Sequence, residues 1–119
     1  MKLEVGQFVR TKRDGIGKII SLSIGEEDEC CFIELSKRRT GIKEHNIIGE
    51  PSFEIIDLIQ EGDYVNGSEV VFKDFNNLNE ECLECGIGDY IVCTYYEDDI
   101  KSIVTKEQME AMAYKVAKE

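Results

Sequence analysis

The stretch Gly62-Asp63-Tyr64-Val65 sets a glycine and a polar residue directly before an aromatic and a β-branched residue. The same step occurs as Gly6-Gln7-Phe8-Val9 and as Gly88-Asp89-Tyr90-Ile91. Glycine accepts the positive φ of a turn, while aromatic and β-branched side chains fit the pleated surface of a strand. Each copy therefore predicts a turn that enters a strand. Their recurrence within 119 residues indicates small twisted sheets, a scaffold that usually binds rather than catalyses.

Short strand patterns separated by turn signals follow the first of these steps. After a strand expected over residues 7–11, the pair Asp14-Gly15 marks a hairpin turn, and residues 16–24 form the returning strand. A third strand pattern covers residues 30–35. This spacing predicts an SH3-like small barrel for residues 1–49.

The only proline, Pro51, marks the expected boundary between two regions. Proline lacks the N–H that a strand ladder uses and disfavours helix in the residue before it. Beyond it, Asn66-Gly67 is the strongest short-range hairpin signal, and strand patterns continue through residues 87–96 and 100–104. We expect residues 50–119 to form a second, hairpin-based β unit, with one core shared by both regions as the alternative.

A helix start lies near the C-terminus, so the predicted class is mainly β (α+β) with one C-terminal helix. Thr105 and Gln108 have the spacing of a capping box, with Thr105 as the N-cap residue. The apolar residues that follow recur at the spacing of one helical face. Such a stripe usually packs on a core, but on a terminal helix it can also join two copies of the chain. The candidate self-association residues are Met109, Met112 and Val116.

Charge is distributed unevenly along the chain. The formal net charge is −11; residues 1–49 hold nine Lys/Arg and eight Asp/Glu, whereas residues 50–119 hold five and seventeen. An acidic surface repels nucleic acids and membrane surfaces and attracts basic partners. One interpretation of this charge is solubility; the functional alternative is that the acidic half docks on a basic, nucleic-acid-binding groove in place of phosphates. The candidate partner-binding residues are Glu80, Glu81, Glu84, Glu97, Asp98 and Asp99.

Several motifs along most of the chain carry a family resemblance. They include Val9-Arg10-Thr11-Lys12, Asn46-Ile47-Ile48, Gly62-Asp63-Tyr64-Val65-Asn66-Gly67 and Ile103-Val104-Thr105-Lys106-Glu107-Gln108. In these motifs the chain resembles a group of small, poorly characterised proteins encoded by phages and prophages of Gram-positive bacteria. The resemblance implies an origin in a mobile element and a β-rich fold. It implies no catalytic residue and no cofactor.

The five cysteines offer one metal-like spacing. Cys82-Leu83-Glu84-Cys85-Gly86 resembles half of a zinc knuckle, but a second, similarly spaced pair is missing. Adjacent Cys30 and Cys31 point to opposite faces of a strand, so at most one of them could join Cys93 or the single His45. We expect ordinary reduced thiols and no bound metal or cofactor, with Cys82 and Cys85 as the metal alternative.

The sequence offers no catalytic constellation. His45 is the only imidazole, so Ser/His/Asp chemistry has no positioned base outside its polar surroundings. The acidic runs at 26–29 and 97–99 fall in expected loops, without the apolar enclosure that raises a carboxyl pKa. No apolar stretch approaches the roughly 18 residues of a membrane span, and the N-terminus runs directly into a strand pattern. We expect a soluble, cytoplasmic, non-enzymatic protein.

Basic residues in the first region support an alternative function. Arg10, Lys12, Arg13 and Lys18 surround one expected hairpin, and residues 37–39 form a second basic group. Basic loops of small barrels can contact phosphates, but the charge of residues 50–119 opposes this. The leading expectation is a protein-binding module, in its sharpest form an anti-CRISPR-like or anti-restriction inhibitor of a basic, nucleic-acid-handling host protein. The alternatives are an accessory module that forms a homodimer, and direct binding of nucleic acid by the N-terminal hairpin.

Overall fold

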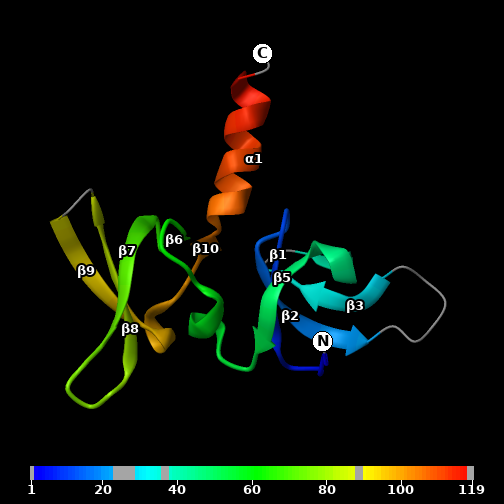
Figure 1. Ribbon diagram of the computed structural model, residues 1–119, viewed down its shortest axis with the longest axis horizontal. Helices are drawn as coiled ribbons and strands as arrows, with labels where there is room; N and C mark the ends of the chain where they lie inside the picture. Colours follow the sequence, from blue (N-terminus) through cyan, green and yellow to red (C-terminus); the bar gives the residue numbers. More distant parts are fainter. Residues whose placement is uncertain (1, 23–28, 36–37, 88–89, 118–119) are drawn as a thin grey trace. The chain divides into compact units, whose positions relative to one another are not determined.

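The computed structural model describes residues 2–22, 29–35, 38–87 and 90–117 (Figure 1). These residues form two five-stranded antiparallel sheets and a C-terminal helix, which confirms the predicted class of a mainly β protein with one terminal helix. The chain divides into two compact units, Met1–Leu58 and Ile59–Glu119. None of the helices in the described ranges is long and apolar enough to cross a membrane.

The first unit is a meander of four strands completed by a fifth. Its sheet has the order β4-β3-β2-β1-β5, in which every neighbouring pair is antiparallel. A 3-10 turn, η1 (Glu44–Asn46), precedes the last strand, and a second, η2 (Ile55–Leu58), follows it. The strands are β1 (Phe8–Thr11), β2 (Ile16–Leu22), β3 (Glu29–Glu34), β4 (Arg39–Lys43) and β5 (Ile47–Ser52).

Apolar side chains from all five strands meet in the core of this unit. Val9, Ile33 and Cys31 are fully buried there, and Leu3 and Leu35 pack against the same cluster. The hydrophobic gain from burying such side chains is roughly 1.5–3 kcal/mol each relative to leaving them exposed. The first sheet is therefore held by its own core, while the closure of an SH3-like barrel stays a prediction.

The second unit contains the other sheet and the helix. Its strand order is β10-β6-β7-β8-β9, again antiparallel throughout. Val65, Val70 and Leu83 are buried in it, as is Ile59. The elements are β6 (Tyr64–Val65), β7 (Ser68–Phe75), β8 (Glu81–Ile87), β9 (Tyr90–Tyr96), the 3-10 turn η3 (Glu97–Asp99), β10 (Ile103–Val104) and α1 (Lys106–Ala117).

The two units repeat one topology. In each, four consecutive strands form a meander, and a fifth strand returns after a 3-10 turn to pair with the first. Gly6 and Gly62 occupy equivalent turns, with φ values of 98° and 95°. Their N–H groups donate to Ile19 and Val70, each at 2.9 Å. Two of the three Gly-x-aromatic steps thus open equivalent strands, whereas the turn at Gly88-Asp89 lies outside the described residues.

The boundary between the units differs from the expected one. Residues 50–58 belong to the first unit, because β5 runs through Pro51 and pairs with β1 at Phe8↔Ser52 and Arg10↔Ile48. β5 is an outer strand of its sheet, where a proline can face away from the ladder. The chain therefore crosses between units after Leu58, and the proline that suggested the boundary lies inside a strand.

Candidate acidic binding surface

Five of the six predicted partner-binding carboxylates belong to the segments that flank one end of the β8–β9 pair. Strand β8 begins at Glu81, strand β9 ends at Tyr96, and the register pairs Cys82 with Tyr96. The residues just before Cys82 and just after Tyr96 therefore flank the same end of the strand pair. We call this set the acidic end; it comprises Glu80, Glu81, Glu97, Asp98 and Asp99.

The turn η3 is fixed by side-chain hydrogen bonds at both of its ends. The Asp99 carboxylate accepts the N–H of Tyr96 at 3.0 Å, which closes a capping box. Asn66, at a φ of 53°, donates its Nδ2 to the Asp99 carbonyl at 2.8 Å and accepts the N–H groups of Lys101 and Ser102. These bonds hold the three acidic residues of η3 against the β6–β7 turn, and all three side chains are exposed.

The β7–β8 turn presents the other part of the acidic end. The Asn76 side chain accepts the N–H of Glu80 at 2.9 Å and donates to the Glu80 carboxylate at 3.1 Å. It also donates to the Tyr96 hydroxyl at 3.4 Å, which links this turn to the end of β9. Glu81 pairs with Lys73 at 3.3 Å, so part of its charge is balanced within the unit. The exposed Glu80 is thus the main charge contributed by this turn.

Glu84, the sixth predicted residue, is set apart from the acidic end. It lies in the middle of β8, opposite Thr94, and is half-buried. Its carboxylate lies 3.9 Å from the Cys82 sulfur. The structure therefore gives Glu84 a place within the sheet surface rather than at its end.

The cysteines of the second unit do not converge on one point. Cys82 and Cys85 are three residues apart on one strand, so their side chains face opposite sides of the sheet. Cys85 is buried and lies directly opposite Cys93 across β8 and β9. His45 is exposed in η1 of the first unit. Across the described ranges, no three His, Cys, Asp or Glu side chains are grouped to hold a metal ion.

Burial is the main cause that raises the pKa of the two thiols on β8, those of Cys82 and Cys85. It raises the pKa of Cys85 to about 11, with a smaller contribution from the neighbouring Cys93 and then from Glu84. It also raises the pKa of Cys82, aided by the charges of Glu84 and Asp74. A hydrogen bond with Cys93 is the main cause that raises the pKa of the Tyr95 hydroxyl. The thiols of Cys82 and Cys85 are therefore protonated, weak nucleophiles at neutral pH.

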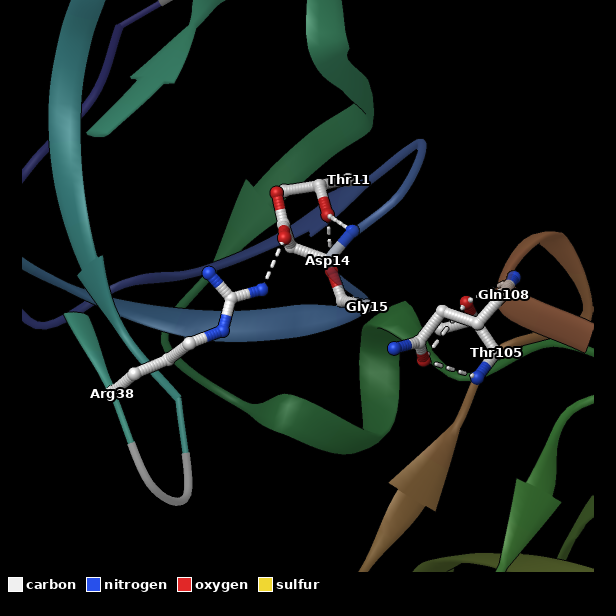
Figure 2. Close-up of polar contacts among 6 residues, drawn as sticks. All are labelled: Thr11, Asp14, Gly15, Arg38, Thr105 and Gln108. Carbon is white, nitrogen blue, oxygen red and sulfur yellow. Dashed lines mark hydrogen bonds and ion pairs between the residues drawn. The ribbon is translucent and has the colours of Figure 1, made fainter. Parts of the chain in front are cut away.

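Three of the described basic residues of the first unit have polar partners within the protein, and Lys37 lies outside the described residues. Arg10, expected near the hairpin surface, is instead buried, and its Nη1 donates to the Leu58 carbonyl at 2.9 Å. Arg38 pairs with Asp14, whose N–H is held by the Thr11 hydroxyl at 2.9 Å (Figure 2). Further along, Arg39 lies 3.5 Å from the carboxylate of Glu34. These partners favour a mixed-charge surface over a phosphate-binding one.

The helix start has the predicted cap. The N–H of Thr105 donates to the Gln108 side chain at 2.9 Å, and the N–H of Gln108 donates to the Thr105 hydroxyl at 3.3 Å (Figure 2). Of the candidate self-association residues, Met109 is 40% exposed and so is not packed in a core. The side chains of Met112 and Val116 lie outside those described.

One further surface was missed by the sequence analysis. Strand β9 is the outermost strand of its sheet, and several of its side chains face solvent. Its signal in the sequence is a run of seven residues, Tyr90–Tyr96, without a charge in a chain that is 33% charged. Which strand lies at the edge depends on pairing between distant residues, so the run alone did not reveal it.

Comparison of the chain with protein-family models, with curated proteins and with solved structures finds no match. The candidate surface is therefore defined by its geometry and charge.

Proposed function

We propose that this protein is a non-enzymatic protein-binding module whose acidic end occupies a basic surface of a partner. The observation that carries the proposal is the Cys82↔Tyr96 pairing, which brings the β7–β8 turn and η3 to the same end of the sheet. Exposed carboxylates gathered in this way produce a local negative field that speeds encounter with a basic surface.

The hydrogen bonds that fix the acidic end support the same function. Asn66 and the Asp99 capping box hold η3, and Asn76 holds the opposing turn. Groups that are fixed before binding lose little conformational freedom in the complex. The acidic end is thus a preorganised surface rather than a solvated loop.

The partner class follows from the chemistry of the surface. Proteins that handle nucleic acids present Lys and Arg toward phosphates, and clustered carboxylates are the side chains that can take the place of those phosphates. Combined with the resemblance to phage and prophage proteins, this makes an inhibitor of a basic host protein, of an anti-CRISPR-like or anti-restriction kind, the sharpest form of the proposal. Such a protein acts in the host cytoplasm.

Capture from a nuclease-treated lysate of a Gram-positive host, eluted with a salt gradient and identified by mass spectrometry, tests this function. The double variant Glu97→Lys/Asp98→Lys reverses two charges at the acidic end and spares Asp99, whose carboxylate accepts the N–H of Tyr96. The control Glu54→Lys/Glu61→Lys changes the net charge equally at exposed positions elsewhere. We expect the first variant to capture about tenfold less of the partner, because it associates more slowly, and the control to capture as much as the wild type. Capture that is indifferent to both salt and the acidic-end variant would show the proposal to be wrong.

An accessory module that self-associates through α1 is the second candidate, favoured by the exposure of Met109. Light scattering distinguishes it: a dimer that Met109→Lys converts to a monomer supports self-association. A monomeric wild-type protein argues against it.

A further inference from the structure

Strand β9 presents an open edge to solvent. In the order β10-β6-β7-β8-β9 it pairs with β8 on one side, and no described strand pairs with its other side. The outer N–H and C=O groups of an edge strand are a template on which another strand can add. β9 spans seven residues, which is long enough for such pairing.

The sequence of β9 lacks the charge and the proline that often protect an edge, although the pairing with β8 skips Val92, as in a β-bulge. Tyr90–Tyr96 contains no charged residue, no proline and no glycine, and it is rich in β-branched and aromatic residues. Tyr90 is 81% exposed and Val92 is 67% exposed. Edge strands that must stay unpaired usually carry a Lys, a Pro or an inward charge. β9 is thus an edge that carries a bulge but neither a charge nor a proline.

The first unit provides an internal comparison. Strand β4 holds the equivalent place at the end of the meander, and it is also an outer strand. Its sequence, Arg39-Thr40-Gly41-Ile42-Lys43, carries a cation at each end and a glycine in the middle. The equivalent edge of the first unit therefore carries charges, although the topology is the same. The lack of charge on the β9 edge is thus a property of the β9 sequence and not of the topology.

The acidic end indicates what kind of strand fits. β9 ends at Tyr96, directly before Glu97, Asp98 and Asp99 of η3. A strand that adds antiparallel to β9 places its own N-terminal end beside η3. Basic residues at that end would meet the carboxylates, while apolar side chains farther along the added strand would lie beside the exposed Val92 and Tyr90.

We propose that the β9 edge binds an extended segment of the partner protein as an added antiparallel strand, with Lys or Arg at the N-terminal end of that segment against the acidic end. This inference rests on the proposed function and specifies how the partner is held. Main-chain hydrogen bonds supply affinity in this mode, and alternate side chains supply specificity. A second copy of the chain is a poorer occupant, because each copy carries a net charge of −11.

A synthetic peptide tests the inference directly. The probe is acetyl-Arg-Lys-Val-Thr-Val-Thr-Val-amide, and its control is the same sequence reversed, with equal composition and charge. Fluorescence anisotropy measures the Kd of each. We expect the probe to bind at least about tenfold more tightly than the reversed peptide, because only the probe sets its cations beside η3 in the antiparallel register. Equal affinities would overturn the inference.

Protein variants locate the edge that is used. Val92→Lys places a charge on β9, and Thr40→Lys places the same charge on the equivalent edge β4. We expect the first to weaken probe binding about tenfold and the second to leave it unchanged. Equal weakening by both would mean that charge alone governs binding, which would refute the role of the edge.

N-methylation of the probe keeps the test independent of the folding of any variant. Methyl groups on alternate amides block one edge of the peptide, and methyl groups on the other alternate set block the opposite edge. We expect one set to abolish binding and the other to preserve it, since only one edge of the peptide faces β9. Loss of binding with both sets of methyl groups, or with neither set, contradicts strand addition.

Two results separate this inference from the proposed function. Partner capture that is weakened by Glu97→Lys/Asp98→Lys but unchanged by Val92→Lys would refute strand addition and leave the acidic end in place. Capture that is unaffected by both salt and the charge reversal would refute the proposed function itself. A dimer in light scattering that Val92→Lys dissociates would overturn the inference in favour of pairing between two copies.

Discussion

Asp63 accepts the backbone N–H of Lys106 at 2.9 Å, although 43 residues separate them. The other oxygen of the same carboxylate accepts the N–H of Gln60 at 2.7 Å. The side chain is fully buried. One carboxylate therefore closes the turn before β6 and caps the first residue of α1, where the helix dipole favours a negative charge.

Replacing Asp63 by alanine is expected to destabilise the second unit by about 2–4 kcal/mol, because two backbone N–H groups lose their partner inside the protein. Asp63→Asn should cost less, since the amide oxygen retains one acceptor position. Urea denaturation measures both. The control is Asp57→Ala in the first unit, where an exposed carboxylate accepts a hydrogen bond from the Ser52 hydroxyl and should contribute little to stability. Equal costs at the two positions would contradict this account.

The burial of Arg10 leads to a second prediction. Its guanidinium joins β1 to the end of η2 through the Leu58 carbonyl. Arg10→Ala removes this bond and the packing of a long side chain, so we expect a loss of about 3 kcal/mol in the free energy of unfolding of the first unit. The exposed Arg13→Ala should change it by less than about 0.5 kcal/mol. Thermal unfolding followed by circular dichroism compares the two variants. A loss of stability in Arg10→Ala as small as that expected for Arg13→Ala would mean that Arg10 has no structural role.

Local chemistry explains what the sequence could predict. The turn glycines Gly6 and Gly62 and the capping pair Thr105 and Gln108 act through residues close to them in the chain, so their patterns indicate the structure directly. The Asn66-Gly67 hairpin is of the same kind, with both residues at positive φ. In such places the sequence and the fold agree because few distant contacts compete.

Pairing between residues far apart in the chain explains what the sequence could not predict. The repeated topology, the burial of Arg10 and the edge position of β9 all depend on which strands become neighbours. Pro51 shows the same limit: its local signal suggested a boundary, but pairing of β5 with β1 keeps it within the first unit. The acidic end likewise exists because β8 and β9 pair in register, which the charge count alone does not specify.

The β8–β9 pair should be sensitive to one glycine. A Cβ added at Gly86 would collide with the carbonyl oxygen of Tyr90 on β9, at the place where the register shifts between Cys85 and Gly86. The backbone cannot move there without loss of pairing between β8 and β9. We therefore expect Gly86→Ala to lower the free energy of unfolding by more than about 2 kcal/mol.

Gly49→Ala is the control for this substitution. A Cβ at Gly49 meets open space, and its φ of 71° imposes only the strain of about 1–2 kcal/mol that an alanine has in this region. Urea denaturation ranks the two variants. If Gly86→Ala is the milder of the two, the strands do not approach as closely as described.

The protonated thiol of Cys85 makes the stability of the second unit depend on pH. Burial, aided by Cys93, raises the pKa of this thiol to about 11, whereas in the unfolded chain it ionises at its lower, ordinary value. Rising pH therefore favours the unfolded state: the contribution of Cys85 is complete below that ordinary value and is lost as the pH approaches about 11. We expect the difference in unfolding free energy between wild type and Cys85→Ala to shrink between about pH 8 and pH 11 in urea titrations, since other titrating groups are common to both proteins. A difference that stays constant or widens over this range would show that the thiol ionises equally in both states.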